Sequence, residues 1–429
     1  MSATTIVGVV AWEALDSRGT PTVACEVRLG GGGRGAATVP SGASTGAHEV
    51  TELRDGGERF GGKGVRQAVA SVNGEIATEL AGTDGAVQDA LDAALVELDG
   101  TPGLSRLGAN AVLAVSLAAS LAAADAEKVP LWRRLGATPL LPLPMVNVIS
   151  GGAHARGAGV DVQDFLVVPV GAASFAEAIE WAWRVRRCTE ELAAERGLPA
   201  SLVADEGGLG LALASNRAGL ELLLAGIERS GLTPGAEAAI AVDVAATQLA
   251  GPHGYLLAAE NRALDATGLV EEVEAWCGDF PIVSIEDPLA EDDWTGWVEA
   301  TRRLGARIQL LGDDLFVTQV GRLERGLRDG AANAVLVKPN QCGTLSGAQT
   351  TVERAREAGY ATVVSARSGD TEDAWLADLA VGWRAGQIKV GSTTRSERTA
   401  KWNRLLRIEQ ELGSDAEFAG RAALAPLGS

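Results

Sequence analysis

The sequence is short of positive charge. Lysine and arginine together number 37, against 56 aspartates and glutamates, so the formal net charge is −19. Such a chain is a poor candidate for non-specific binding to nucleic acid or to an anionic membrane. An anionic small substrate is still possible, because a bound metal ion can invert the local field. We therefore expect neither a nucleic acid nor a membrane as a partner, and we attribute most of the acidity to solubility.

Cysteine is also scarce, and the four residues are far apart: Cys25, Cys188, Cys277 and Cys342. Their spacing matches no metal-binding pattern, so we expect reduced and mostly buried side chains. The first residues show no basic region followed by an apolar core, which argues against a signal peptide. Together these features predict a cytoplasmic protein.

We expect no apolar run that spans a membrane. The most apolar stretch covers residues 111–124 and lies between Asn110 and Asp125. Its alanine-rich composition predicts a buried helix.

The length of 429 residues favours two domains. Residues 1–137 combine a predicted β-meander, over 5–40, with mostly helical sequence, over 63–136, and the small-residue loop 41–50 is expected to lead into a helix. The proline-containing segment 138–144 is the predicted linker, because proline disfavours continuation of a helix. Residues 138–429 then alternate strand-like and helix-like segments, which predicts an α/β fold.

Five apolar runs of strand length in the second domain lead to a charged residue. A charge at such a position is costly to bury unless it is paired or binds a ligand. Strand–helix repeats with chemistry at the strand ends predict a parallel α/β barrel whose site lies at the C-terminal face. The five charged residues are Asp243, Glu286, Asp313, Lys338 and Lys389.

The three acids form a set of hard oxygen ligands that suits Mg²⁺. Each one alone is more simply explained as a helix cap or a salt bridge near a loop. Their shared position after an apolar run favours the metal interpretation for Asp243, Glu286 and Asp313.

The two lysines would face the same rim as the acids. A lysine beside another cation and a divalent metal is pushed towards its neutral form, in which it can take a proton from carbon. The alternative is that Lys338 and Lys389 extend to solvent, which is less typical of a lysine that closes a strongly apolar run.

Other candidates lie in loops. Glu206 follows the run SLVAD, which reads as a strand, and precedes two glycines; it is a candidate acid or, almost equally, a capping residue in a turn. Small-residue loops at 41–46 and 150–159 offer Ser44 as a metal or phosphate ligand and His154 as a substrate contact. Arg367 and Ser368 follow a predicted strand, where an arginine is suited to bind phosphate.

These stretches resemble the enolase family from about Val7 to Gly413. The segments that carry the resemblance include DSRGTPTV, VPSGASTGAHE, LGANAVLAVSLA, PMVNVISGGAHA, DEGG, SIEDPLAEDDW, GDDLFVT, VKPNQCGTL and GQIKVGS. The resemblance implies an N-terminal α+β domain and a C-terminal barrel with an unusual ββαα start. It also implies a homodimer or larger assembly and Mg²⁺ at two sites.

The resemblance further implies dehydration of 2-phospho-D-glycerate to phosphoenolpyruvate through a metal-stabilised ene-diolate, chemistry that is general in this superfamily. Lys338 matches the base that takes the C2 proton, and Glu206 the acid that assists departure of the C3 hydroxyl. The implied metal ligands are Asp243, Glu286, Asp313 and, for the second ion, Ser44. The implied contacts to this small phosphorylated carboxylate are Lys389, Arg367, Ser368, Gln163, His154 and Asp164.

The chain also departs from the family pattern. Ala366 stands where the family usually has histidine, residues 209–212 replace an aromatic–Ala–Pro–Asn sequence, Asp164 replaces glutamate, and Pro339 follows the lysine directly. The loop 153–159 differs too. These changes suggest an altered leaving-group side of the pocket.

Two alternatives to an ordinary family member follow. One is a paralogue of secondary metabolism, of the carboxyphosphonoenolpyruvate synthase type in phosphonate antibiotic biosynthesis. It would act on a related phospho- or phosphono-compound because Ala366 leaves extra room. The other is a non-catalytic scaffold, which has no need of a costly cluster of buried charges.

Overall fold

The computed structural model describes residues 2–155 and 159–425. The first 40 residues form an antiparallel sheet of β1 (Ile6–Leu15), β2 (Pro21–Leu29) and β3 (Arg34–Thr38), which confirms the predicted meander. The helices that follow are η1 (Arg59–Gly62), α1 (Arg66–Ser71), η2 (Val72–Ile76), α2 (Ala77–Leu80), α3 (Gln88–Asp99), α4 (Ala109–Glu127) and α5 (Leu131–Leu135). The expected helix directly after the loop 41–50 is wrong, because residues 47–58, all described, contain none.

Helix α4 is the alanine-rich segment, and it is the core helix of this domain. It is long and apolar enough to cross a membrane, yet 83% of its most apolar window is buried inside the protein. It packs against β2, β3 and α3. Gly35 on β3 allows this close approach, because a Cβ there would overlap the backbone of Ala118 and Ala122. The prediction of a buried helix is confirmed.

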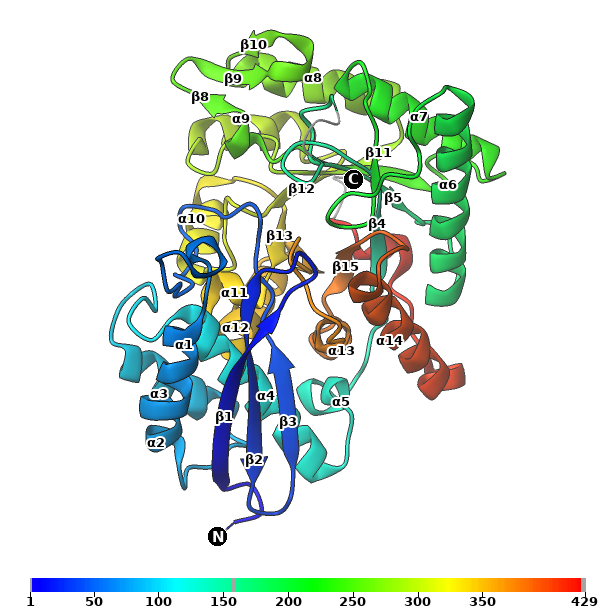
Figure 1. Cartoon of the computed structure of the whole chain (residues 1–429). Helices are drawn as coiled ribbons and strands as arrows, with labels where there is room; N and C mark the ends of the chain where they lie inside the picture. Colours follow the sequence, from blue (N-terminus) through cyan, green and yellow to red (C-terminus); the bar gives the residue numbers. More distant parts are fainter. Residues whose placement is uncertain (1, 156–158, 426–429) are drawn as a thin grey trace.

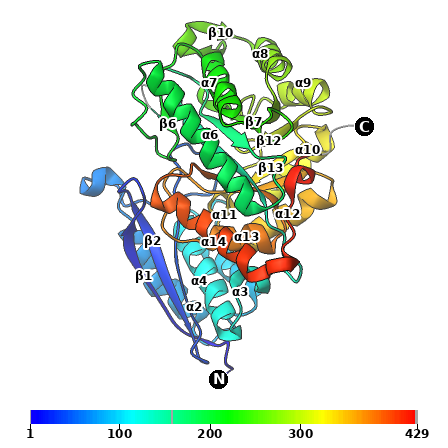
Figure 2. The same cartoon turned by 90° about the vertical axis from the view of Figure 1, so that its right-hand side faces the viewer.

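Eight strands of the described chain close into a barrel (Figures 1 and 2). In order around it they are β15 (Gly386–Gly391), β14 (Ala361–Ser365), β13 (Ala334–Val337), β12 (Gln309–Gly312), β11 (Ile282–Glu286), β7 (Ala239–Asp243), β5 (Asp164–Val168) and β4 (Leu143–Ser150). Pairing of β15 with β4 completes the ring, and β5 runs antiparallel to both neighbours. Strand β4 begins inside the segment predicted as a linker.

The barrel starts with two strands followed by two helices, α6 (Phe175–Glu195) and α7 (Asn216–Arg229), as the resemblance implies. Ser174 and Ser215 cap these helices by accepting backbone N–H groups. The later helices are α8 (Ala266–Asp279), α9 (Trp294–Leu304), α10 (Val320–Asp329), α11 (Pro339–Cys342), α12 (Leu345–Glu357), α13 (Trp375–Gly382) and α14 (Ser396–Leu412). Short elements complete the domain: β6 (Leu209–Gly210), η3 (Ala246–Gln248), β8 (Ala250–Gly251), β9 (Gly254–Leu257), η4 (Ala258–Glu260), β10 (Arg262–Leu264), η5 (Gly413–Asp415) and η6 (Gly420–Ala423).

The interior of the barrel is filled by side chains at every second strand position. Ala334 and Leu336 of β13, for example, belong to a buried apolar cluster with Leu166, Ala241 and Leu311 of neighbouring strands. This is the alternation expected of a strand, whose successive side chains point to opposite faces. The site residues continue the same alternation at the C-terminal ends.

Two further expectations need correction. Residues 201–208 are all described and form no strand, so Glu206 follows a turn and the bridge Val203–Leu209 instead. Only Cys25 is buried, whereas the other three cysteines are partly exposed on helices; all four are free. Cysteines on the amphipathic faces of helices need only partial burial.

The N-terminal domain contacts the barrel near the strand ends that carry charges. Ser41 forms a bridge with Gly369, just beyond β14. Helices α4 and α5 contact α11 and α13 of the second domain. A loop of the first domain thus lies beside the predicted site.

Candidate active site

Three carboxylates and two lysines meet at the C-terminal end of the barrel. Lys389 Nζ donates to Asp243 Oδ2 at 2.6 Å and to Glu286 Oε2 at 2.7 Å. Lys338 Nζ donates to Asp313 Oδ2. All five side chains are buried. The parallel strands therefore bring together the five residues that the sequence analysis selected.

The negative charges of this cluster are stabilised unequally: despite its burial, the pKa of Asp313 is lowered by Lys338. The pKa of Glu286 is raised well above its ordinary value by burial and by the charge of Asp243. Burial would also lower the lysine pKa values, but the adjacent carboxylates outweigh it, so the pKa of Lys338 is raised and that of Lys389 is raised strongly. Each ammonium group is ion-paired here, and the expectation that a bound divalent metal pushes the lysines towards the neutral form stays a prediction.

A second buried group surrounds His154. Its Nδ1 lies 2.8 Å from Asp164 Oδ2, and its Nε2 lies 3.9 Å from Glu206 Oε1. Burial lowers the pKa of His154, but the charges of Asp164 and Glu206 raise it to about 9. Asp164 also accepts from Asn147 and Ser150, and it does not line the catalytic cavity. Its carboxylate orients His154 and is placed behind it, away from the predicted substrate position.

The predicted phosphate-binding residues are covered by the loop from the first domain. Arg367 donates to the backbone oxygen of Ser44 at 2.9 Å and to both carboxylate oxygens of Glu49 at 3.0 and 3.1 Å. Ser368 Oγ accepts from the backbone N–H of Ala43 at 2.6 Å. Gly42 permits this packing, because a Cβ there would overlap Arg367. The loop therefore has to shift, or exchange these contacts, when an anion binds.

Amide side chains hold the carboxylates in place. Gln163 donates to Asp243 Oδ2 at 3.0 Å, and Gln341 donates to Asp313 Oδ1 at 2.9 Å. The sequence analysis selected Gln163 but missed Gln341 and Glu49. Both missed residues lie in stretches already noted for their resemblance, VKPNQCGTL and VPSGASTGAHE, where proximity to Lys338 and Ser44 was the available signal.

The donor set fits a divalent cation. Among the residues that the structure describes, two groups of three ligands lie within 4.8 Å of one another: His154, Asp164 and Glu206, and Asp287, Asp313 and Asp314. Asp287 is already engaged, since its two oxygens accept the backbone N–H groups of Asp313 and Asp314. Asp243, Glu286 and Asp313 are not one of these two groups, since lysine ammonium groups lie on their oxygens. They stay the predicted ligands, because a cation such as Mg²⁺ would stabilise their charge in place of those ammonium groups.

One cavity joins nearly all of these groups. It is small, about 10 Å³, and its lining includes Ser44, His154, Gln163, Glu206, Asp243, Lys338, Ala366, Arg367, Ser368 and Lys389. Ala366 thus faces the site, as expected. Leu209 and Leu211 are fully buried, and residues 209–212, all described, do not line the cavity. The lining of this cavity therefore gives no support to the idea that the loop alters the leaving-group side, which stays a prediction.

One other departure, Pro339, has a structural explanation. Pro339 is the first residue of α11, where its missing N–H costs nothing, so it fits directly after Lys338. The loop 153–159 lies partly outside the described residues. The fold and site define a class: α/β barrels with buried lysines and carboxylates that line one cavity at the C-terminal end of the strands.

Comparison with known proteins identifies the particular family. The family model described as the enolase N-terminal domain matches residues 6–135, and that of the enolase C-terminal TIM barrel domain matches residues 138–427. A protein named Enolase from Acidothermus cellulolyticus is 51% identical over 413 residues, which cover 96% of this chain and 95% of the relative. The chain belongs to the enolase family, and it is a carbon–oxygen lyase of the phosphopyruvate hydratase type.

Proposed function

We propose that this protein dehydrates 2-phospho-D-glycerate to phosphoenolpyruvate, with Lys338 removing the C2 proton. The observation that supports this most directly is the joint placement of Lys338, Lys389 and three carboxylates at successive strand ends. A buried lysine on a rigid strand end is well placed for proton transfer from carbon. Lys389, held beside the carboxylates, would contact the carboxylate of the substrate.

Glu206 is the proposed acid. It is buried, it lines the same cavity as Lys338, and it lies beside His154. In this assignment Glu206 gives a proton to the departing C3 hydroxyl, which leaves as water. Arg367 and Ser368 would bind the phosphate, and Gln163 and His154 would contact the remainder of the substrate.

We further propose two Mg²⁺ sites, one at Asp243, Glu286 and Asp313 and a second at Ser44. The metal supplies positive charge that stabilises the dianion formed when the C2 proton is lost. The buried position of the three acids and the raised pKa of Glu286 support the first site. Support for the second is limited to the position of Ser44 at the cavity.

The paralogue alternative is less well supported. Among the described residues, Ala366 is the one departure from the family pattern that lines the cavity, because none of residues 209–212 does. The relative at 51% identity carries the name Enolase, which does not favour a phosphonate pathway. The scaffold alternative has less support, because burying a complete set of charged side chains is costly and a scaffold has no need of them.

We also propose a homodimer or larger assembly and a cytoplasmic location. Trp12 on β1 and Trp183 on α6 are 46% and 55% exposed, and such apolar surface suits a homodimer or a larger assembly. The four free cysteines suit the reducing cytoplasm.

The test is phosphoenolpyruvate formation from 2-phosphoglycerate with Mg²⁺, followed by ultraviolet absorbance. We expect robust turnover by the wild type. In Lys338→Ala we expect turnover to fall by about 10²–10⁴-fold, because general-base catalysis contributes that much. Circular dichroism would show that the variant is folded. A folded, Mg²⁺-binding wild type without turnover would contradict the proposal and favour a phosphono-substrate.

A further inference from the structure

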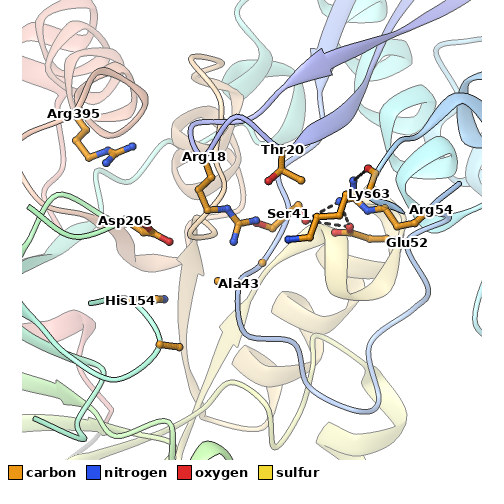
Figure 3. A pocket seen from close by; sticks show the side chains of 12 residues that line it. Arg18, Thr20, Ser41, Ala43, Glu52, Arg54, Lys63, His154, Asp205 and Arg395 are labelled. Atoms are coloured by element: carbon orange, nitrogen blue, oxygen red, sulfur yellow. Dashed lines mark hydrogen bonds and ion pairs between the residues drawn. The ribbon is translucent and has the colours of Figure 1, made fainter. Parts of the chain in front are cut away.

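A larger cavity of about 690 Å³ lies beside the catalytic one (Figure 3). His154 lines both cavities, and Gly42 and Ala43 form part of the wall of the larger one. Its other walls come from the β1–β2 turn, the segment 52–63, Asp205 and Arg395. The larger cavity is therefore adjacent to the place where the phosphate of the substrate is proposed to bind.

Four cations line this cavity, but two of them are already neutralised. Arg54 donates to Glu52 at 2.5 Å and to the backbone oxygens of Pro21 and Lys63. Arg395 donates to Glu397 at 2.8 Å. These two arginines serve mainly to hold the wall together.

Of the other two cations, Lys63 is free for a ligand, and Arg18 keeps part of its donor capacity although it is held by Asp16 and by the backbone oxygen of Ser41. Lys63 is exposed and forms no ion pair with any residue in the described ranges 2–155 and 159–425. Arg18 has one ion pair, with Asp16 at 3.3 Å, and its buried Nε has no hydrogen-bond partner within the described chain. Its Nη1 lies 3.4 Å from Ser368 Oγ. Arg18 thus connects the large cavity to the proposed phosphate site.

We propose that Lys63 and Arg18 form an entry subsite that captures the anionic end of the substrate before it reaches Arg367 and Ser368. The identity of that substrate rests on the proposed function. A chain with a net charge of −19 repels a polyanion, so unneutralised cations at the mouth of the site would offset the repulsion. In Figure 3, Asp205 and Arg395 lie on the side of the cavity away from Lys63. Glu52, the acid on the Lys63 side, is paired with Arg54, which leaves Lys63 as the free positive charge there.

The test compares Lys63→Gln with Lys128→Gln, a matched control that removes an exposed lysine of the same domain at the C-terminal end of α4. At low ionic strength we expect the KM of Lys63→Gln for 2-phosphoglycerate to rise about 3–10-fold with kcat unchanged, by loss of electrostatic attraction. The difference should vanish near 0.5 M KCl, where the screening length is only about 4 Å. Lys63→Arg should keep the wild-type KM, as should the control.

Equal KM values for Lys63→Gln and wild type at every salt concentration would overturn the proposal. So would a fall in kcat with a KM that does not respond to salt, which would place Lys63 in loop closure or chemistry. If the wild type does not turn over 2-phosphoglycerate, the proposed function fails separately. The subsite is then tested by ³¹P line broadening of inorganic phosphate at low salt, which should be weaker in Lys63→Gln than in Lys128→Gln; equal broadening would refute it.

Discussion

The two ends of the barrel interior are formed by the same strands, but one end is lined by apolar side chains and the other by charged side chains. In the middle of β13, Ala334 and Leu336 point inward and pack in an apolar cluster, and the next inward position is Lys338. In β7, Ala239 and Ala241 likewise precede Asp243. One alternating face thus changes from apolar to charged within two residues. The apolar end stabilises the fold, and the charged end carries the chemistry at a cost in stability.

That cost is visible in the electrostatics. Apolar side chains in the interior each contribute about 1.5–3 kcal/mol when fully buried. At the rim, burial instead raises the pKa of Glu286 far above its ordinary value, which shows that its charged form is disfavoured. Residues whose surroundings disfavour their charged form are typical of functional sites.

The largest effect should come from a change at the charged end. Asp243→Asn should reduce turnover by at least about 10³-fold, because it removes a proposed metal ligand and several kcal/mol of charge stabilisation in the transition state. Its free energy of unfolding should change by less than about 1 kcal/mol, since Lys389 keeps Glu286 as a partner and repulsion falls. Steady-state kinetics and urea unfolding check the two expectations.

Asp279→Asn, at an exposed helix end, is the matched control and should affect neither quantity. Substantial turnover by Asp243→Asn would exclude this residue from the site.

The opposite pattern is expected at the apolar end. Leu336→Ala should lower the free energy of unfolding by about 2–5 kcal/mol, the usual cost of a cavity in a well-packed interior. The kcat of the molecules that remain folded should stay near that of the wild type, because Lys338 is on the next inward position and keeps its partner. Urea unfolding and kinetics at low temperature measure both. A large loss of kcat without loss of stability would mean that the two ends are not separable.

The smallest effect concerns a buried ion pair near the rim that serves the fold. Lys401 Nζ donates to Asp370 Oδ1 at 2.6 Å; burial raises the pKa of Asp370, but Lys401 and Arg398 outweigh it and lower the pKa. A lowered pKa stabilises the fold above the ordinary value near 4, and this contribution is lost as the pH falls through the folded-state value. Asp370→Asn should therefore be less stable by about 1.5–3 kcal/mol at pH 7.

The same variant should also lose less stability than the wild type between pH 5 and pH 2. Unfolding by urea at several pH values checks this slope. Parallel curves would show that Asp370 titrates alike in the folded and unfolded states.

The sequence by itself determined the strand ends and their charges. Apolar runs of strand length that lead to Asp243, Glu286, Asp313, Lys338 and Lys389 are local patterns, and parallel pairing then requires them to share one rim. The meander and the buried helix α4 were predictable for the same reason, since both follow from hydrophobic periodicity.

Only the tertiary structure decided how the charges pair and which loops reach them. Gln341 and Glu49 contact Asp313 and Arg367 from distant parts of the chain, and no local pattern specifies such partners. The pKa of Lys389 is raised because folding places carboxylates within 3 Å of its ammonium group, whereas the prediction of a neutral lysine rested on a neighbouring cation and a bound divalent metal. Burial of Leu209 was equally a tertiary outcome, since β6 pairs with β4. The type of side chain sets which interactions a residue can form, and tertiary packing decides which neighbours form them.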